Sequence, residues 1–218
     1  LAGHPHRAAP EPLPEGTDAL AARVRDGEDL VLEVDGPVLH VVAPDRPGLF
    51  SKVAGTLALH GLDVVSARAW SPDEGMAAER FRVQSLYGTP DWAAVEADLR
   101  RVLAGRISLE ARLAEKARDY AAAPRPPAAA PARLEVTVDN DASEVATVVE
   151  VRAPDRIGTL YRITRALAEL HLDVRLAKVS TLGHEVVDAF YVVDAEGAKL
   201  TDSEHLEEVR RAVTAHLA

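Results

Sequence analysis

Two short stretches of the chain repeat the same chemistry-bearing residues. Asp-Arg-Pro-Gly occurs at residues 45–48 and Asp-Arg-Ile-Gly at residues 155–158, each preceded by Ala-Pro. A glycine lets a ligand approach the backbone closely, and an arginine guanidinium binds a carboxylate through two parallel hydrogen bonds. Both stretches are therefore candidate sites for the carboxylate of a small molecule. The alternative is a purely structural turn, in which the aspartates cap the following helix and the arginines are solvated.

Each stretch lies between a predicted strand and a predicted helix. Val38 to Ala43 and Ala146 to Ala153 are predicted strands, and in the second of them Val149, Val151 and Ala153 alternate with polar residues. After each glycine, apolar residues recur at helical spacing: Phe50, Val53 and Leu57 in the first copy, and Leu160, Ile163, Leu167 and Leu170 in the second. Unpaired N–H groups and the helix dipole at a helix N-terminus favour a bound anion. The two turns are therefore predicted anion sites.

The repeat continues beyond the turns. Second strands are predicted over 63–70 and 173–181, and third strands over 79–86 and 186–193. A second helix carries Trp92, Val95, Leu99 and Val102 in one copy and Leu206, Val209, Val213 and Leu217 in the other, and the first can extend through Leu109, Leu113 and Tyr120. Leu134, Val136 and Val138 then predict a fourth strand for the first copy. The result is an α+β fold of two ferredoxin-like βαββαβ domains, antiparallel sheets backed by helices.

The predicted domains follow from this repeat. Residues 1–29, which begin with Leu1 and include a Pro-rich stretch, are interpreted as a linker from an absent catalytic region. Domain 1 covers residues 30–140, with a Pro/Ala-rich insertion near 121–132, and domain 2 covers residues 141–218. No closing strand is visible in domain 2. Leu30 to Val34 can either fill that gap or form a hairpin with Val38 to Ala43 through Gly36-Pro37.

The candidate ligand-binding residues are the two turns with their flanks and the aspartates at the start of the second strands. They are Pro44, Asp45, Arg46, Pro47, Gly48, Leu49, Phe50 and Asp63 in the first copy, and Pro154, Asp155, Arg156, Ile157, Gly158, Thr159, Leu160 and Asp173 in the second. At a domain interface, Asp63 or Asp173 can accept a ligand's ammonium group; the alternative is that they cap or solvate a turn.

Composition argues against several other classes of function. The net charge is −10 and aromatic residues make up 4%, which disfavours nucleic acid. Cysteine is absent, the eight histidines show no metal-ligand spacing, and no phosphate loop or nucleophile elbow occurs, so no catalytic and no metal site is predicted. Because no long apolar run or signal peptide is visible, a cytoplasmic protein with no membrane partner is expected.

The repeated strand, Pro-Asp-Arg-X-Gly turn, helix and Leu-Asp-Val strand resemble the ACT domain. ACT domains are regulatory modules that bind amino acids at this turn, often between paired domains. The stretches 42–50, 148–156 and 187–192 further resemble the paired C-terminal ACT domains of the bifunctional uridylyltransferase/uridylyl-removing enzymes of the PII signal protein. Ile157 in place of Pro47, and Thr159 in place of Leu49, depart from the first copy's pattern and leave open whether both turns bind equally.

The resemblance implies a glutamine-sensing module without cofactor or active site of its own. It also implies absent catalytic domains in the same chain, a nucleotidyltransferase and an HD-type hydrolase, for which Mg²⁺ is expected. The PII protein is the expected protein partner in nitrogen regulation, and self-association into a homodimer stays open, as does uridylyl against adenylyl transfer. The alternatives are a stand-alone two-domain regulator that acts through a protein partner and, more remotely, a ferredoxin-like RNA-binding pair.

Overall fold

The computed structural model describes residues 12–71, 75–85, 88–121, 133–182 and 185–218. The first half contains α1 (Thr17–Arg25), β1 (Val31–Asp35), β2 (Val38–Pro44), α2 (Leu49–Leu59), β3 (Leu62–Trp70), β4 (Met76–Ser85), α3 (Trp92–Leu103) and α4 (Leu109–Ala121). The second contains β5 (Glu135–Asp139), β6 (Thr147–Pro154), α5 (Thr159–Glu169), β7 (Asp173–Lys178), β8 (Thr181–Leu182), β9 (Glu185–Val193) and α6 (Ser203–Leu217). The predicted strands and helices of the repeat are confirmed to within a few residues; the predicted end of one strand at Leu86 lies outside the described residues.

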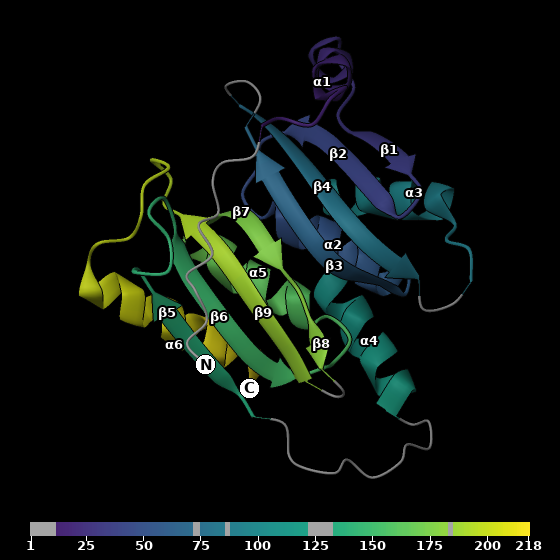
Figure 1. The fold of residues 1–218 in the computed structure, drawn as a ribbon. Helices are drawn as coiled ribbons and strands as arrows, with labels where there is room; N and C mark the ends of the chain where they lie inside the picture. The colour runs from purple at the N-terminus through teal and green to yellow at the C-terminus, as the bar shows by residue number, and fades with distance from the viewer. Residues whose placement is uncertain (1–11, 72–74, 86–87, 122–132, 183–184) are drawn as a thin grey trace.

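The two halves share one antiparallel sheet (Figure 1). Its strand order is β1-β2-β4-β3-β7-β9-β6-β5, and β8 pairs with β9 beside this path. The halves meet where β3 runs antiparallel to β7, with Ser66 opposite Lys178, Ala67 opposite Ala177 and Arg68 opposite Leu176. This strand pairing, called the seam below, relates the halves by an approximate two-fold axis.

The first strand of each half, β1 or β5, lies at the edge of the sheet, where a βαββαβ domain has its last strand. β1 pairs with β2, so Leu30 to Val34 forms the hairpin with Val38 to Ala43 and does not complete the second half. β5 pairs with β6, so the assignment of Leu134, Val136 and Val138 to the first copy was wrong. Each half is therefore ordered ββαββα, and its leading strand lies where the closing strand of a βαββαβ domain would lie. The predicted fold class, antiparallel sheets backed by helices, is confirmed.

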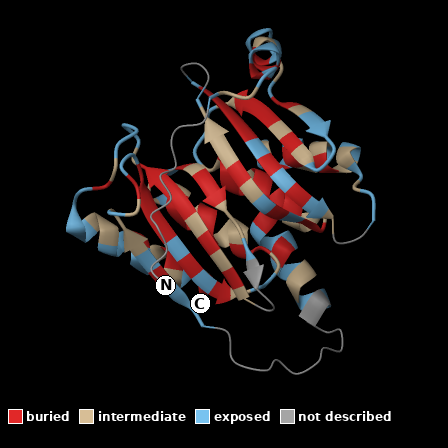
Figure 2. Cartoon of the chain, in the orientation of Figure 1, coloured by how far each residue is buried: buried red, intermediate tan, exposed pale blue. Residues whose placement is uncertain are grey.

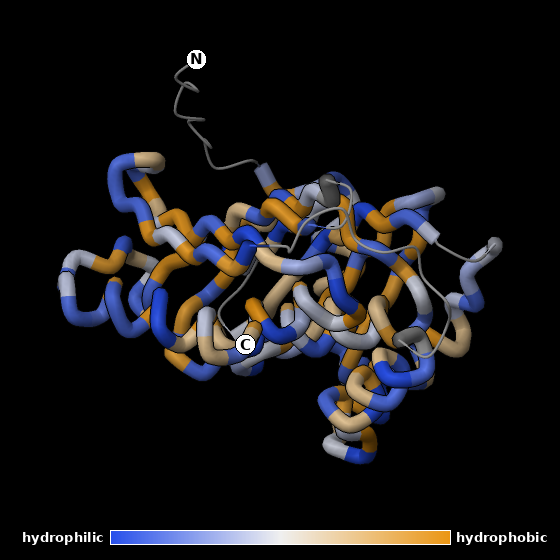
Figure 3. The backbone as a smooth tube through the Cα atoms, turned by 90° about the horizontal axis from the view of Figure 1, so that it is seen from below, coloured by the Kyte–Doolittle hydropathy of each residue, from blue (hydrophilic) through white to orange (hydrophobic). Residues whose placement is uncertain are grey.

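The main core lies between the sheet and one layer of helices. Strand residues alternate between buried and more exposed positions, as Figure 2 shows along the central strands. Seen at right angles to that view, hydrophobic and hydrophilic residues also alternate along the chain (Figure 3). One continuous hydrophobic cluster includes Phe81 and Leu57 from the first half and Phe190 and Leu167 from the second. Because this cluster crosses the seam, the two halves bury their apolar surface together.

The opposite face of the sheet, called the outer face below, is partly covered by α1. Leu20, Ala21 and Val24 of this helix pack on Val42 and Met76, together with Val31 and Ala78. Residues 1–29 were expected to be a linker, but residues 17–25 form a helix because they present an apolar stripe that this sheet face buries.

A second difference concerns the helix that was expected to continue from α3. α3 ends at Leu103, and Gly105, with its positive φ of 69°, interrupts the helical conformation before α4 begins at Leu109. α4 packs against α2 and reaches α5: Leu113 lies beside Gly158, and Leu109 and Tyr161 lie beside Gly55. A Cβ on Gly55 would lie only 2.8 Å from Leu109 and from Tyr161. The absence of a side chain at Gly55 therefore allows α2, α4 and α5 to pack closely.

Among the residues described, no helix is long and apolar enough to cross a membrane. Within the same ranges, no three His, Asp or Glu side chains are grouped so that they could hold a metal ion.

Gly55→Ala tests the close approach of these helices. Alanine favours a helix over glycine by about 1 kcal/mol, so an uncrowded site would gain stability. We expect a loss of roughly 1 to 3 kcal/mol instead, because the new methyl group forces the packed side chains apart. Thermal unfolding followed by circular dichroism measures the difference. A melting temperature at or above that of the wild type would contradict the packing described here.

Candidate functional site

The two Asp-Arg-X-Gly stretches form the same turn in the structure. Gly48 and Gly158 are the N-cap residues of α2 and α5, with φ angles of 75° and 83°, which glycine adopts without strain. Because glycine has no side chain, the N-cap position itself provides no capping group, and Asp45 and Asp155 are not the N-cap residues of these helices. Each aspartate stands three residues before the capping glycine.

Hydroxyl groups stabilise each turn from within the following helix. The Thr159 hydroxyl donates to the Arg156 carbonyl oxygen over 2.9 Å and accepts from the Arg156 N–H over 3.3 Å. In the first half, the Ser51 hydroxyl donates to the Gly48 carbonyl oxygen over 2.8 Å. The departure from the first copy's pattern at Thr159 therefore has a local structural role.

The second turn borders a cavity of about 240 Å³ at the boundary between the halves. One side of the cavity is formed by Asp155 to Leu160, and the other by the junction of α2 and β3, including Asp63. Lys116 from α4 and Asp188 from β9 complete its polar lining. We call this cavity the α5-turn site. It joins a predicted anion-binding turn of one half to the predicted ammonium acceptor of the other.

The first turn has a related but much smaller cavity, called the α2-turn site. Its volume is about 50 Å³, and its lining includes Asp45, Arg46 and Gly48 to Phe50 from one half and Asp173 from the other. Three of the predicted residues line neither cavity: Pro44, Pro47 and Pro154. At about 30 Å³ per water, 240 Å³ corresponds to about eight waters and 50 Å³ to one or two. Of the two turn sites, therefore, the α5-turn site is the one with room for a metabolite.

A pair of buried carboxylates was missed by sequence reasoning. Asp188 on β9 lines the α5-turn site, and Glu79 on β4 lines the α2-turn site. They are 2% and 4% exposed and lie on the core face of the sheet, each two residues before a core phenylalanine. The repeat contained a signal for them, because aligning Phe81 with Phe190 also aligns the two acids on the inward side of otherwise apolar strands.

Burial dominates the titration of both acids. It raises the pKa of Asp188 to about 7, with a further rise from the negative charge of Asp155 and an opposing effect from the Ser180 N–H, which donates to Asp188 over 3.3 Å. Burial likewise raises the pKa of Glu79 to about 8, and Asp45 adds to the rise. The Glu79 Oε2 atom has no hydrogen-bond partner among the described residues. Each buried acid is therefore stabilised by a proton or by a nearby cation.

The aspartates at the start of the second strands are coupled to the turns. Desolvation raises the pKa of Asp63, the charge of Asp155 raises it further, and Lys116 opposes the rise. Desolvation also raises the pKa of Asp173; there Arg175 opposes the rise and Asp45 adds to it. The aspartate in the turn of each half therefore interacts electrostatically with the second-strand aspartate of the other half. The prediction that these residues meet at a domain interface is supported by this arrangement, while their role as ligand contacts stays a prediction.

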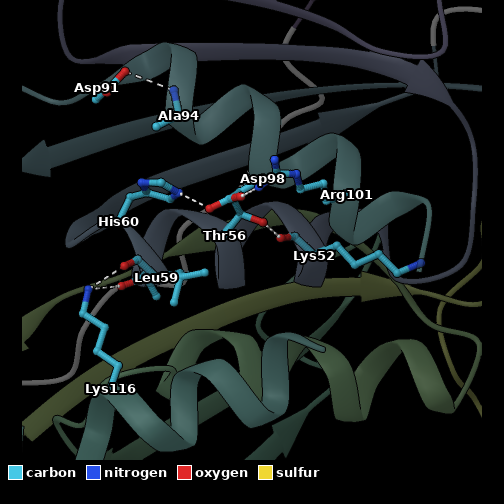
Figure 4. A network of polar contacts seen from close by, with 10 residues as sticks. Lys52, Thr56, Leu59, His60, Asp91, Ala94, Asp98, Arg101 and Lys116 are labelled. Carbon is cyan, nitrogen blue, oxygen red and sulfur yellow. Dashed lines mark hydrogen bonds and ion pairs between the residues drawn. The ribbon is translucent and has the colours of Figure 1, made fainter. Parts of the chain in front are cut away.

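Lys116 connects α4 to the α5-turn site. Its Nζ atom donates to the carbonyl oxygens of Ala58 and Leu59 over 3.0 and 2.7 Å, at the C-terminal end of α2 (Figure 4). A cation at this end of a helix is favoured by the helix dipole. Nearby, His60 Nε2 lies 3.1 Å from Asp98 Oδ2, which joins the end of α2 to α3. The wall of the cavity formed by α2 is therefore held in place from two neighbouring helices.

Together these groups suit a zwitterion. Asp63, Asp155 and Asp188 favour a positively charged group, whereas the first-turn amides of α5 and the Arg156 guanidinium favour a carboxylate. An α-amino acid carries both charges on adjacent atoms. A second carboxylate in the ligand would be repelled by the three acids.

Glu79→Gln tests the buried acid of the α2-turn site. The folded-state pKa of about 8 lies above that of an unfolded glutamate, so the folded protein keeps a proton that the unfolded chain loses above about pH 4.3. The stability of the wild type should therefore fall as the pH rises from 5 to 8, and the variant should remove part of this fall. We expect its melting temperature to exceed that of the wild type at pH 8 by at least about 2 °C, with little difference at pH 5. Glu33→Gln on exposed β1 is the control; equal pH profiles for all three proteins would contradict the burial of Glu79.

Comparison with known proteins gives this arrangement a family. The ACT domain model matches residues 38–103, and the model described as the ACR family N-terminal ACT domain matches residues 142–218. A bifunctional uridylyltransferase/uridylyl-removing enzyme of Rhodospirillum rubrum is 37% identical over 187 residues, which are 80% of this chain and 19% of that protein. The enzyme with this name from Streptomyces coelicolor is 46% identical over 176 residues, 78% of this chain and 21% of that protein.

Among solved structures, an aspartate kinase from Synechocystis aligns with 81% of this chain and 26% of its own, at 19% identity and a TM-score of 0.32, which is too low to support a conclusion. The chain spans about a fifth of the length of the curated relatives it matches. Both halves are matched by ACT models at the turn, helix and strands that form the two cavities. The chain therefore belongs to the ACT-domain family, as a tandem of two ACT domains homologous to part of the bifunctional uridylyltransferase/uridylyl-removing enzymes.

Proposed function

We propose that this tandem binds one neutral amino acid, with glutamine as the first candidate, at the α5-turn site. The proposal rests on one observation: a cavity of about 240 Å³ combines the turn of the second half with Asp63 of the first half and the buried Asp188. Glutamine has about ten non-hydrogen atoms, which matches a space of about eight waters. The α2-turn site, at about 50 Å³, is too small for it.

The ligand would be oriented by its two charges. Its carboxylate would accept hydrogen bonds from the first-turn amides of α5, and its ammonium group would lie among Asp63, Asp155 and Asp188. Such an ammonium group would lower the pKa of Asp188, because an adjacent cation favours the charged form of a carboxyl. Glutamate, with its second carboxylate, would bind more weakly than glutamine.

Binding at this position would regulate a larger protein. The cavity lies between the two halves, so a bound ligand favours the arrangement in which both of its walls are close together. Lys116, which belongs to α4 and donates hydrogen bonds to the end of α2, would couple the position of α4 to the same arrangement. By analogy with the relatives, we propose that the tandem controls uridylyl transfer and removal on the PII signal protein by catalytic domains of the same longer chain, in response to nitrogen supply.

Isothermal titration calorimetry tests the α5-turn site, and the equivalent acid at the α2-turn site provides the control. We expect glutamine to bind with a stoichiometry near one and Asp188→Asn to weaken binding by at least about tenfold, since a lost charge-assisted hydrogen bond is worth roughly 1.5 to 3 kcal/mol. Glu79→Gln changes the equivalent acid at the other turn and should leave the affinity unchanged.

The same titrations contain the results that would refute the proposal. Absence of heat with glutamine and with other neutral amino acids would remove the ligand class. A stoichiometry near two, or equal losses in Asp188→Asn and Glu79→Gln, would show that the small α2-turn site also opens to bind ligand. Equal affinity for glutamate would contradict the role given to the three acids.

A further inference from the structure

A group of basic residues lies on the outer face of the sheet, away from both cavities. Across the paired strands, Arg80 stands opposite Arg68, and Ser66 stands between Arg82 on β4 and Lys178 on β7. Side chains directly opposite each other in a sheet project from the same face. Ala67 and Ala177, the next residues along β3 and β7, belong to the core on the helix side, so these four basic side chains project outward. We call Arg68, Arg80, Arg82 and Lys178 the basic patch.

Three residues of the basic patch, Arg80, Arg82 and Lys178, have no carboxylate partner among the described residues. Arg80 and Arg82 are exposed. Lys178 instead lies 5.6 Å from the centre of the Tyr191 ring. The charge of Arg80 also lowers the pKa of His40, which stands opposite it on β2, although desolvation is the larger cause. Arg80 and Arg82 lie two residues apart on β4 and project from the same face of the sheet, so one anionic partner can contact both guanidinium groups.

The surroundings limit the size of that partner. Along one row of the sheet, Glu33 on β1 lies beyond His40, and along the next row Glu150 on β6 lies beyond Lys178 and Ala189. α1 covers the sheet from Ala78, two residues before Arg80. The basic patch is therefore bounded on three sides, in a chain whose net charge is −10. From β4 to β7 it spans two strand spacings of about 4.8 Å, to which the long side chains add several ångströms.

We propose that the basic patch binds a short acidic segment of a polypeptide. An extended peptide advances about 3.3 Å per residue, so roughly three to five residues cover the patch. Its carboxylates, on alternate residues, can pair with arginine guanidinium groups in bidentate geometry. A nucleic acid fits less well, because its longer phosphate backbone would run toward Glu33 or Glu150. The Tyr191 ring beside Lys178 is only 7% exposed and offers little stacking surface for a base.

Fluorescence anisotropy with a labelled hexaglutamate peptide tests this proposal on the 218-residue chain. We expect binding that weakens as salt is added, because the attraction is between exposed charges. Arg80→Glu with Arg82→Glu should weaken it at least tenfold. Arg112→Glu with Arg118→Glu is the matched control: both residues are exposed on α4, and the change in net charge is the same. The control should retain the affinity of the wild type.

Each result has a defined meaning. Equal weakening in both double variants would show a response to net charge alone and would overturn the proposal, as would the absence of hexaglutamate binding. Tighter binding of an oligothymidine of matched charge would overturn it in favour of nucleic acid. If circular dichroism shows that the double glutamate variant is unfolded, Arg80→Gln with Arg82→Gln replaces it, and the same loss relative to Arg112→Gln with Arg118→Gln is required. The proposal is independent of amino-acid binding at the α5-turn site.

Discussion

The antiparallel pairing of β3 with β7 is the interaction on which the remaining architecture depends. Three residue pairs join the halves there, and at the centre two alanines, Ala67 and Ala177, face the core. Since these side chains are small, α2 and α5 can pack against each other beneath the seam. There the side chains of Tyr161 and Leu109 pack closely against Gly55. The same pairing brings the turn of each half to the second-strand junction of the other. Without it, the turns would remain helix ends without an opposing wall.

The internal repeat places two related cavities in the structure, and their volumes are unequal. Both have a glycine N-cap, a turn aspartate, a buried acid on the sheet and an aspartate from the opposite half. α4 follows the first half and supplies Lys116 to the α5-turn site. At the α2-turn site, Phe50 and Trp70 are among the lining residues, and the acid is the longer Glu79. These bulkier side chains are consistent with its smaller volume. The approximate symmetry makes each cavity a control for the other.

Much of the fold could be predicted from the sequence, because the repeat doubles every local signal. The turns, the alternation of the strands and the stripes of the helices were all visible. The neighbour of the strand at Leu134 to Val138 was not, since alternation shows that a segment is a strand without showing which strand it pairs with. Gly36-Pro37 between two apolar runs indicated the hairpin of β1 with β2, but the sequence left open whether this strand pairs there or in the second half.

α1 was missed because a short amphipathic helix is stabilised mainly by the surface on which it docks. Asp45 is not the N-cap residue of α2, because that position has a positive φ and is taken by Gly48. Asp188 was not predicted as a site residue, because an acid in an apolar strand does not by itself indicate that a cavity lies beside it.

In the function proposed above, the two halves jointly form one amino-acid site, with the second half providing the turn and the first half providing Asp63. A crystal structure of the chain grown with glutamine tests this most directly. We expect density for one ligand between α5 and the junction of α2 with β3, with its carboxylate at the first turn of α5 and its ammonium group near Asp188. Density in the α2-turn site alone, or a ligand bound without any contact to the first half, would contradict it.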